Sequence, residues 1–198
     1  MKILIISLSI IVVLFIIFQT YLYMMATKTA SQPYTVMLKG NDFEIRQYPV
    51  ATMARVTSHA SKYSDLANSG FGTLANYIFG GNETSEQIAM TSPVHMDIND
   101  SLSSMSFVMP EKYSINNLPK PNDKEVEIYT TDVDFVAVIT FDGFASDEVI
   151  NVQKQKLKNA LDVSKITTIG HYRFLGYNPP YQIFGRRNEI IVSINWDK

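Results

Sequence analysis

An apolar run at the N-terminus constrains this chain more than any other feature of its sequence. From Ile3 to Phe18 only two residues, both serines, are not apolar. At about 1.5 Å per helical residue, the run and the residues that follow it span roughly the thickness of a bilayer core. The sequence therefore predicts a membrane-spanning helix over residues 1–25, with Tyr21 and Tyr23 at the membrane interface.

A cleaved signal peptide is the alternative interpretation of this run. It requires a shorter apolar region and a cleavage site with small residues at two positions separated by one residue. At Ala26 the residue two positions earlier is Met24, and at Ala30 it is Lys28, so neither site fits. The sequence favours an uncleaved anchor. For a lone N-terminal anchor we expect the folded body on the non-cytoplasmic side.

Composition limits what the rest of the chain does. Its 198 residues are 46% hydrophobic, which is enough for one folded domain. A net charge of -2 without a long basic stretch argues against a nucleic-acid partner, since phosphate neutralisation needs clustered Lys and Arg. The absence of cysteine excludes disulfides and thiolate metal ligands. The sequence carries no signal for the oligomeric state.

The first half of the body shows strand patterns and one helical pattern. Residues 26–33 are small and polar and are expected to form a linker, so the body covers residues 34–198. Apolar residues spaced by three and four predict an amphipathic helix at 64–79, which ends before Gly80 and Gly81. Alternation and turn residues predict strands at 34–38, 43–48, 50–57, 88–98 and 104–109.

The second half repeats this order. Strands are predicted at 126–129, 135–141, 169–175 and 190–196, and a second helix begins at Ser146. Apart from the additional first strand at 34–38, the order strand, strand, helix, strand, strand thus occurs twice. The sequence predicts an α+β fold in which two pseudo-repeated halves form a distorted antiparallel β-barrel or sheet with two helices, in addition to the N-terminal transmembrane helix.

One glycine motif looks like a cofactor signature but has the wrong context. Gly70, Gly72 and Ala75 match the letters of a dinucleotide fingerprint, yet they lie inside a helical pattern and not at a strand-to-helix turn. Close packing of the helix on the sheet is the better interpretation.

Candidate ligand-binding residues are scattered through the body. The three histidines His59, His95 and His171 lack metal-ligand spacing and are weak candidates for iron ligands. Met90 is one of several central methionines that could line an adaptable apolar pocket, although ordinary core filling explains each of them as well. Arg186 and Arg187 follow a loop that contains Tyr177, Pro179, Pro180, Tyr181 and Phe184. This arrangement suits a flat apolar ligand with carboxylates, and a solvated basic turn is the alternative.

Five segments taken together resemble the SOUL haem-binding protein family in order and spacing. They are Phe43-Glu-Ile-Arg-Gln-Tyr-Pro49, Ile88-Ala-Met-Thr-Ser-Pro-Val94, Phe141-Asp-Gly-Phe-Ala145, Gly176-Tyr-Asn-Pro-Pro180 and Arg186-Arg-Asn-Glu189. The resemblance extends from about Tyr34 to Trp196. It implies two pseudo-repeated halves forming a distorted barrel, binding of haem or a related tetrapyrrole, and no enzymatic step common to the family.

The resemblance transfers sites less directly than it transfers the fold. Gln47 stands where one branch of the family has a proposed histidine ligand, and Asn68 and Asn76 stand where another branch has basic residues on the first helix. Haem binding would then depend mostly on burial of the macrocycle, with basic side chains near the propionates. The expected haem-binding residues are Lys62, Asn68, Phe71, Asn76, Met90, Tyr177, Pro179, Tyr181, Arg186 and Arg187.

The sequence leaves three functions to compare. The first is a membrane-tethered protein that buffers, carries or senses haem or another tetrapyrrole. The second is a general small-molecule or effector-binding domain on the same scaffold, without haem. The third is an enzyme that uses an acidic residue such as Glu44 or Glu189 as a base, but no activated nucleophile or base pair can be named. The sequence favours binding over catalysis.

Overall fold

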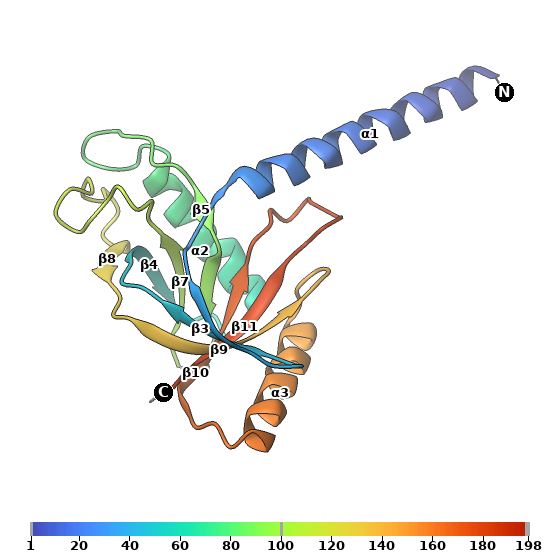
Figure 1. The fold of residues 1–198 in the computed structure, drawn as a ribbon. Helices are drawn as coiled ribbons and strands as arrows, with labels where there is room; N and C mark the ends of the chain where they lie inside the picture. Colours follow the sequence, from blue (N-terminus) through green and yellow to red (C-terminus); the bar gives the residue numbers. More distant parts are fainter. Residues whose placement is uncertain (1, 100, 197–198) are drawn as a thin grey trace.

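A computed structural model describes residues 2–99 and 101–196. Figure 1 shows a body of strands and two helices, from which the N-terminal helix projects as a long arm. The helices are α1 (Lys2–Lys28), α2 (Tyr63–Ile78) and α3 (Asp147–Val163). The strands are β1 (Ala30–Ser31), β2 (Thr35–Lys39), β3 (Glu44–Tyr48), β4 (Thr52–Ser58), β5 (Thr91–Ser92), β6 (Val94–Asp97), β7 (Ser103–Val108), β8 (Glu127–Thr130), β9 (Asp134–Phe141), β10 (Thr168–Gly176) and β11 (Asn188–Ile194).

The main sheet confirms the predicted repeat. Its nine strands lie in the order β2-β3-β9-β11-β10-β6-β7-β4-β8, and each neighbouring pair is antiparallel. Without the edge strand β2, this order is symmetric about its centre. The positions of β3, β4, β6 and β7 from the first half mirror those of β8, β9, β10 and β11 from the second half. The two halves are therefore related by a pseudo-twofold axis between β10 and β6, and the sheet curls into a half-barrel as the sequence predicted.

Both helices of the body pack on one side of the sheet, which we call the helix face. α2 lies against β4 and β7, and α3 lies against β9 and β11. The amphipathic pattern explains this placement, because Leu66 and Leu74 of α2 and Leu157 of α3 are fully buried in the same core. Alternate residues of β11 join them, including Ile190 and Val192. The other side of the sheet is called here the opposite face.

The glycine motif of α2 is a packing feature, as predicted. A Cβ atom at Gly70 would lie 3.1 Å from the Met105 Cβ atom and 3.3 Å from a Val56 methyl group. A larger residue at this position would push α2 away from β4 and β7. Gly72 has nothing within 4 Å of such a Cβ atom, so it faces open space on the outer side of the helix.

The stretch 88–98, predicted as one strand, forms two strands. β5 and β6 are separated by Pro93, whose missing N–H interrupts a strand ladder. β5 leaves the main sheet and pairs in parallel with β1, with Ala30 opposite Thr91 and Ser31 opposite Ser92. The segment predicted as a linker therefore includes the end of α1 and a strand that is paired with the body.

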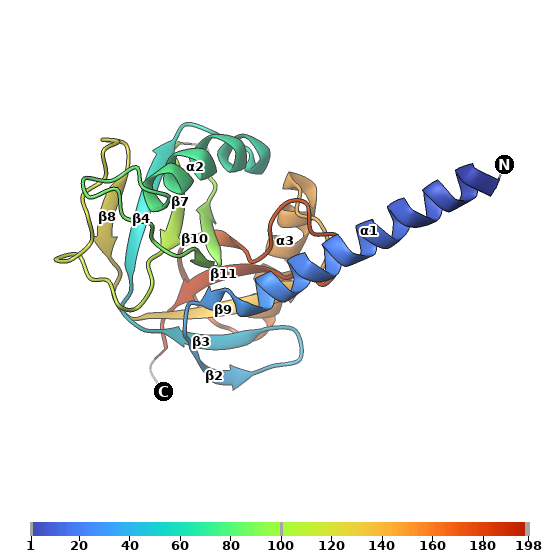
Figure 2. The same cartoon turned by 90° about the horizontal axis from the view of Figure 1, so that it is seen from above.

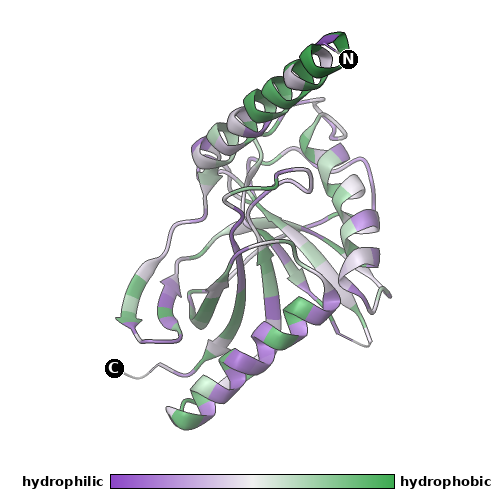
Figure 3. Ribbon diagram, turned by 90° about the vertical axis from the view of Figure 1, so that its right-hand side faces the viewer, coloured by the Kyte–Doolittle hydropathy of each residue, from purple (hydrophilic) through white to green (hydrophobic). Residues whose placement is uncertain are grey.

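α1 is exposed along most of its length. Figure 3 colours most of the N-terminal part of this helix as hydrophobic. The large apolar side chains between Ile3 and Phe18 are exposed. By length and composition it is the one described helix that could cross a membrane, a property shared by anchors and signal sequences. Only Gln19 and Leu22 of this helix are buried, and both lie near its C-terminal end.

Candidate functional site

A cavity of about 520 Å³ lies on the helix face, beside α3. The strands under it are β6, β10 and β11, which occupy the middle of the sheet next to the pseudo-twofold axis. Its apolar lining residues are Met96, Ile98, Ile150, Tyr172, Phe174 and Ile190, and its polar ones include Ser61, Asp147, Asn151, Lys154 and His171. The floor of the cavity is apolar, but polar residues make up the larger part of its lining, so the cavity suits an amphipathic ligand that carries charges.

One of the two exposed histidines lies at this cavity. His171 lies on β10, lines the cavity and is exposed. Lys154 of α3 also lines the cavity, with its Nζ atom 5.6 Å from the centre of the Tyr172 ring. His59 lies outside the lining, but its Nδ1 atom is 3.3 Å from the carbonyl oxygen of Ser101, a residue that lines the cavity. The cavity lining therefore includes both an imidazole and an ammonium group.

His95 lies on the opposite face in a second cavity of about 380 Å³. Burial, together with the positive charge of Arg173, lowers the pKa of His95 to about 3. The ring is therefore neutral, and its Nε2–H group donates to Gln32 Oε1 at 2.8 Å. Its neighbours here are largely polar or charged, and they include Arg55, Asp97, Ser106, Tyr129, Asp134 and Arg173. Such a wall suits a small polar ligand better than a macrocycle.

The opposite face also contains a buried charge cluster centred on Glu189. This carboxylate is completely buried and accepts hydrogen bonds from Arg46, Arg187, Tyr177 and Thr140. Burial and the negative charge of Glu189 raise the pKa of the Tyr177 phenol. Glu44 pairs with the same Arg46 at 2.7 Å. Both carboxylates considered as enzymatic bases are thus held in ion pairs with arginines.

Arg186 supports the β10–β11 loop (Tyr177–Arg187), from the inside. Its guanidinium donates to the carbonyl oxygens of Gly143, Pro179 and Gln182 and lies 4.5 Å from the centre of the Phe144 ring. The residue is 7% exposed, and burial lowers its pKa. Neither sequence interpretation fits this position. Arg186 is not a solvated turn residue, and its guanidinium already donates to main-chain carbonyl oxygens of the loop and of Gly143.

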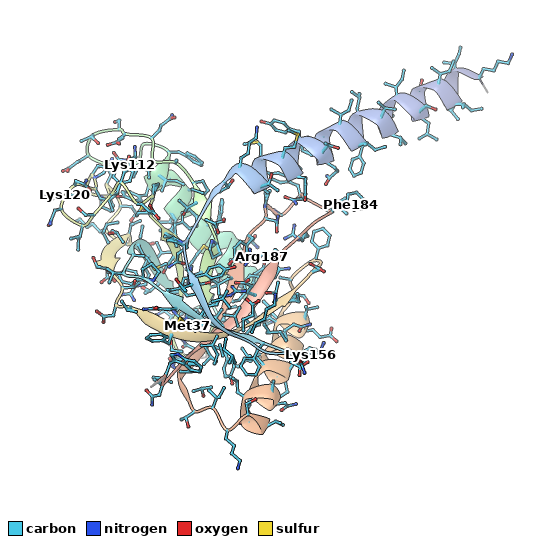
Figure 4. The ribbon with its side chains drawn as sticks, viewed as in Figure 1. Met37, Lys112, Lys120, Lys156, Phe184 and Arg187 are labelled. Carbon is cyan, nitrogen blue, oxygen red and sulfur yellow. The ribbon has the colours of Figure 1, made fainter. Side chains whose placement is uncertain are left out.

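Arg187 and Tyr177 lie on the side of the sheet away from α2. The Arg187 guanidinium pairs with Glu189 at 2.7 Å and lies 4.2 Å from the centre of the Tyr177 ring. Figure 4 shows Arg187 in the middle of the body, and alternation along the strands sends its side chain to the opposite face. These two residues therefore do not meet the outer surface of α2, where other predicted haem contacts lie.

The predicted residues on α2 form an exposed stripe. Lys62 precedes the helix, and Asn68 and Asn76 are exposed along it. Phe71 is 43% exposed and contacts Phe107 edge-on with ring centres 5.3 Å apart. Together with open Gly72, this surface could hold one side of a flat ring. Met90 is half-buried and packs against the main core, so it acts as core filling.

Sequence reasoning missed most of the cavity on the helix face. None of the residues expected to contact haem lines either of the two cavities, whereas His171 lines the first and His95 the second. The missed residues Ile98, Lys154 and Tyr172 come from three separate elements, which only the repeat brings together. Among the described residues, no group of three or more His, Asp or Glu side chains could hold a metal ion.

A family model described as SOUL heme-binding protein matches residues 29–193. The chain belongs to the SOUL family. The match covers the whole body from the end of α1 to β11, and the palindromic strand order is the two-half architecture that the resemblance implied.

Relatives of this SOUL domain include Heme-binding protein 2 and Heme-binding protein 1. Heme-binding protein 2 of Mus musculus is 28% identical over 156 residues, covering 75% of this chain and 76% of the relative. Heme-binding protein 1 of Xenopus laevis is 27% identical over 158 residues, covering 76% of this chain and 83% of the relative.

Solved structures extend the likeness of the fold beyond SOUL proteins. The EcmrR C-terminal domain has a TM-score of 0.62 at 6% identity, covering 82% of this chain and 98% of that one. A hydrolase from Listeria innocua has a TM-score of 0.56 at 8% identity, covering 80% of this chain and 94% of that one. At such identities only the fold is shared.

Proposed function

We propose that this SOUL protein is a membrane-tethered binding protein for haem or a related tetrapyrrole, which it buffers, carries or senses, and that it is not an enzyme. The proposal rests on the cavity beside α3 on the helix face. It combines an apolar surface, an accessible imidazole and a cation in a chain whose named relatives are heme-binding proteins.

The residues of the cavity fit the chemistry of haem. Phe174 and Ile190 would contact the apolar macrocycle, His171 would offer an imidazole to the iron, and Lys154 would pair with a propionate. The resemblance gives a second position on the same protein, between the exposed stripe of α2 and the β10–β11 loop. There Phe71 and Lys62 would contact the ligand, without a histidine.

The membrane tether is supported by the contacts of the C-terminal part of α1. Gln19 and Leu22 are buried against the body, and Gln32 bonds His95 inside the opposite-face cavity. Cleavage after Ala26 or Ala30 would remove the first two contacts, which favours a retained anchor over a signal peptide. The proposed organisation is an anchor over residues 1–25, a connection over 26–33 and a haem-binding domain over 34–198, with that domain on the non-cytoplasmic side.

A binding role without catalysis is consistent with the state of the acidic residues. For Glu44 or Glu189 to act as a general base, its carboxylate would have to be free and within reach of a substrate. Glu189 is buried and bonded to two arginines, and Glu44 shares Arg46 with it. Neither side chain lines the cavity on the helix face.

A titration of the full chain with haemin, in detergent or in vesicles, tests the proposal. Saturable one-to-one growth of a shifted Soret band is the expected result. Metal-free protoporphyrin, titrated in parallel, reports how much of the affinity comes from the iron. If haemin produces only the non-saturable spectrum of its aggregates, haem is not the ligand and the proposal fails.

A general small-molecule binder is the second candidate, and the cavity on the opposite face favours it. Asp97 Oδ1 and Arg55 Nε both belong to residues that line this cavity, are buried, and have no hydrogen-bond partner among the described residues. Unpaired polar atoms of this kind suit a small polar molecule that would satisfy them. Such a ligand would bind without a Soret change, so calorimetry with haem-free protein separates the two functions.

A further inference from the structure

The β10–β11 loop is joined to the proposed membrane helix by a polar clamp. Gln19 is the buried polar residue of α1, and its side-chain amide donates to the carbonyl oxygen of Tyr181 at 3.1 Å. The same amide accepts from the N–H of Ile183 at 2.9 Å. The Tyr23 ring lies so close to Gly185 that a Cβ atom there would be 2.7 Å from it. The loop is therefore fixed against one level of α1, as Figure 2 shows from above.

Three buried polar side chains satisfy the main chain of this loop. Gln19 bonds Tyr181 and Ile183, and Arg186 bonds the carbonyl oxygens of Pro179 and Gln182. Gln182 is 1% exposed, and its amide donates to the carbonyl oxygens of Phe184 and Gly185. Polar main-chain groups that are paired internally are what an irregular segment needs in order to lie at membrane depth.

Three large apolar side chains at the tip of the same loop point outward. Phe184 is 65% exposed, Tyr181 59% and Ile183 43%, and Phe144 from the neighbouring turn is 53% exposed. Figure 4 shows Phe184 on the α1 side of the molecule, well away from Lys156 of α3. A soluble surface gains nothing from four large apolar groups held beside an apolar helix, whereas a bilayer interface would bury them.

The length of α1 sets the depth of the loop. Counting from Ile3, about 20 residues are needed to cross a hydrocarbon core of roughly 30 Å. That count ends near Leu22, so Gln19 and the clamped loop fall at the boundary between the core and the headgroups. Tyr and Phe side chains are favoured at this level.

We propose that the tip of the β10–β11 loop, with Tyr181, Ile183 and Phe184, together with Phe144, inserts into the membrane interface beside α1. The partner of this surface is the lipid bilayer itself. The inference rests on the proposed membrane anchor, and it adds a second contact that fixes the orientation of the body on the membrane. It also assigns Gln19 and Arg186 to positioning of the loop and not to ligand binding.

Site-directed fluorescence tests this insertion, because the chain has no cysteine. Single cysteines at Phe184→Cys and Tyr181→Cys would carry an environment-sensitive NBD label in the full chain, reconstituted in phosphatidylcholine and phosphatidylglycerol vesicles. Ile11→Cys serves as the control for the anchor and Lys156→Cys as the control for the exposed body. We expect blue-shifted emission and quenching by nitroxide-labelled lipids at 11, 181 and 184, and neither effect at 156.

The controls separate the two ways of failing. If position 11 is quenched by lipid while 181 and 184 behave like 156, the anchor is retained and the loop insertion is wrong. If position 11 also behaves like 156, the proposed anchor itself fails and the insertion fails with it. A Gln19→Leu variant keeps the helix apolar but removes the clamp, and it is expected to weaken the lipid quenching at 184 while leaving that at 11 unchanged.

Discussion

The two faces of the sheet hold cavities in which the polar groups are arranged differently. On the helix face, the floor is made of side chains such as Phe174 and Ile190, and the charged groups stand at the rim. On the opposite face, charged groups lie inside and pair with one another, as Arg173 does with Asp134 and Arg46 with Glu189. One sheet thus separates a cavity with apolar side chains at its floor from a cavity lined largely by polar and charged groups.

The largest effect is expected from breaking the charge cluster of the opposite face. Glu189→Ala leaves Arg46, which is 3% exposed, without its buried partner, and the free energy of unfolding should fall by about 3–5 kcal/mol. Urea unfolding of the full chain in detergent, followed by circular dichroism, measures it. Glu44→Ala is the matched control, because its carboxylate is 25% exposed and its loss should cost clearly less. Equal losses in the two variants would mean that burial does not govern this cluster.

The second largest effect is expected in the pH dependence of stability, which should differ between variants of His95 and of His171. The pKa of His95 is lowered to about 3, so between that value and its ordinary 6.5 the unfolded state binds more protons than the folded state. The stability from neutral His95 is complete above pH 6.5 and decreases as the pH falls, by about 2 kcal/mol at pH 5. His95→Gln should remove this part of the slope and His171→Gln should not. An unchanged slope in His95→Gln would show that His95 is not a buried neutral group.

Replacement of the rim histidine should affect haem and not stability. His171→Ala is expected to weaken haemin binding at least about tenfold, or ~1.4 kcal/mol, and to shift the Soret maximum, because the imidazole leaves the iron. His59→Ala and His95→Ala are the comparison variants. The same loss in His59→Ala instead would move the iron ligand to the end of β4, and no loss in any variant would indicate burial without histidine ligation.

The smallest effect concerns the rim cation. Lys154→Gln should lower haemin affinity by a factor of about two to five, since an exposed ion pair contributes at most ~1 kcal/mol. The difference should shrink at high salt. Lys156→Gln on the same helix removes the same positive charge. Because Lys156 lies outside the cavity lining, this variant should have no effect on haemin affinity. Identical losses in both variants would reveal a general charge effect and not a propionate contact.

Sequence periodicity was sufficient to predict the body of the fold. Apolar residues alternate along β11 at Ile190, Val192 and Ile194, and they follow helical spacing in α2. Each pattern shows which side of its own strand or helix is buried, and it needs no knowledge of the other elements. The repeat of the two halves followed from the order of these elements. Pro93 could be seen in the sequence, but the division of the predicted strand into β5 and β6 could not. The pairing of β5 with β1 is set by distant residues.

The sites could be predicted less well, because they depend on where side chains meet. Arg186 and Arg187 are neighbours in sequence, yet one supports a loop and the other joins the Glu189 cluster on the opposite face. Gln19 did carry a signal, as a lone amide late in an apolar helix, which usually marks a specific polar partner. The partner itself lies 162 residues away at Tyr181, and only the folded chain identifies it.

The central claim is that haem occupies the cavity beside α3 on the helix face, and a block of that cavity tests it most directly. Asn151 lines the cavity from the exposed side of α3, so Asn151→Trp would fill it without disturbing the core. Asn159→Trp places the same ring on α3 outside the cavity lining. In haemin titrations of the full chain, we predict that Asn151→Trp loses the saturable Soret band while Asn159→Trp keeps it. Binding of haemin by Asn151→Trp with the affinity of the unmodified chain would contradict the claim and move the ligand to α2 and the β10–β11 loop.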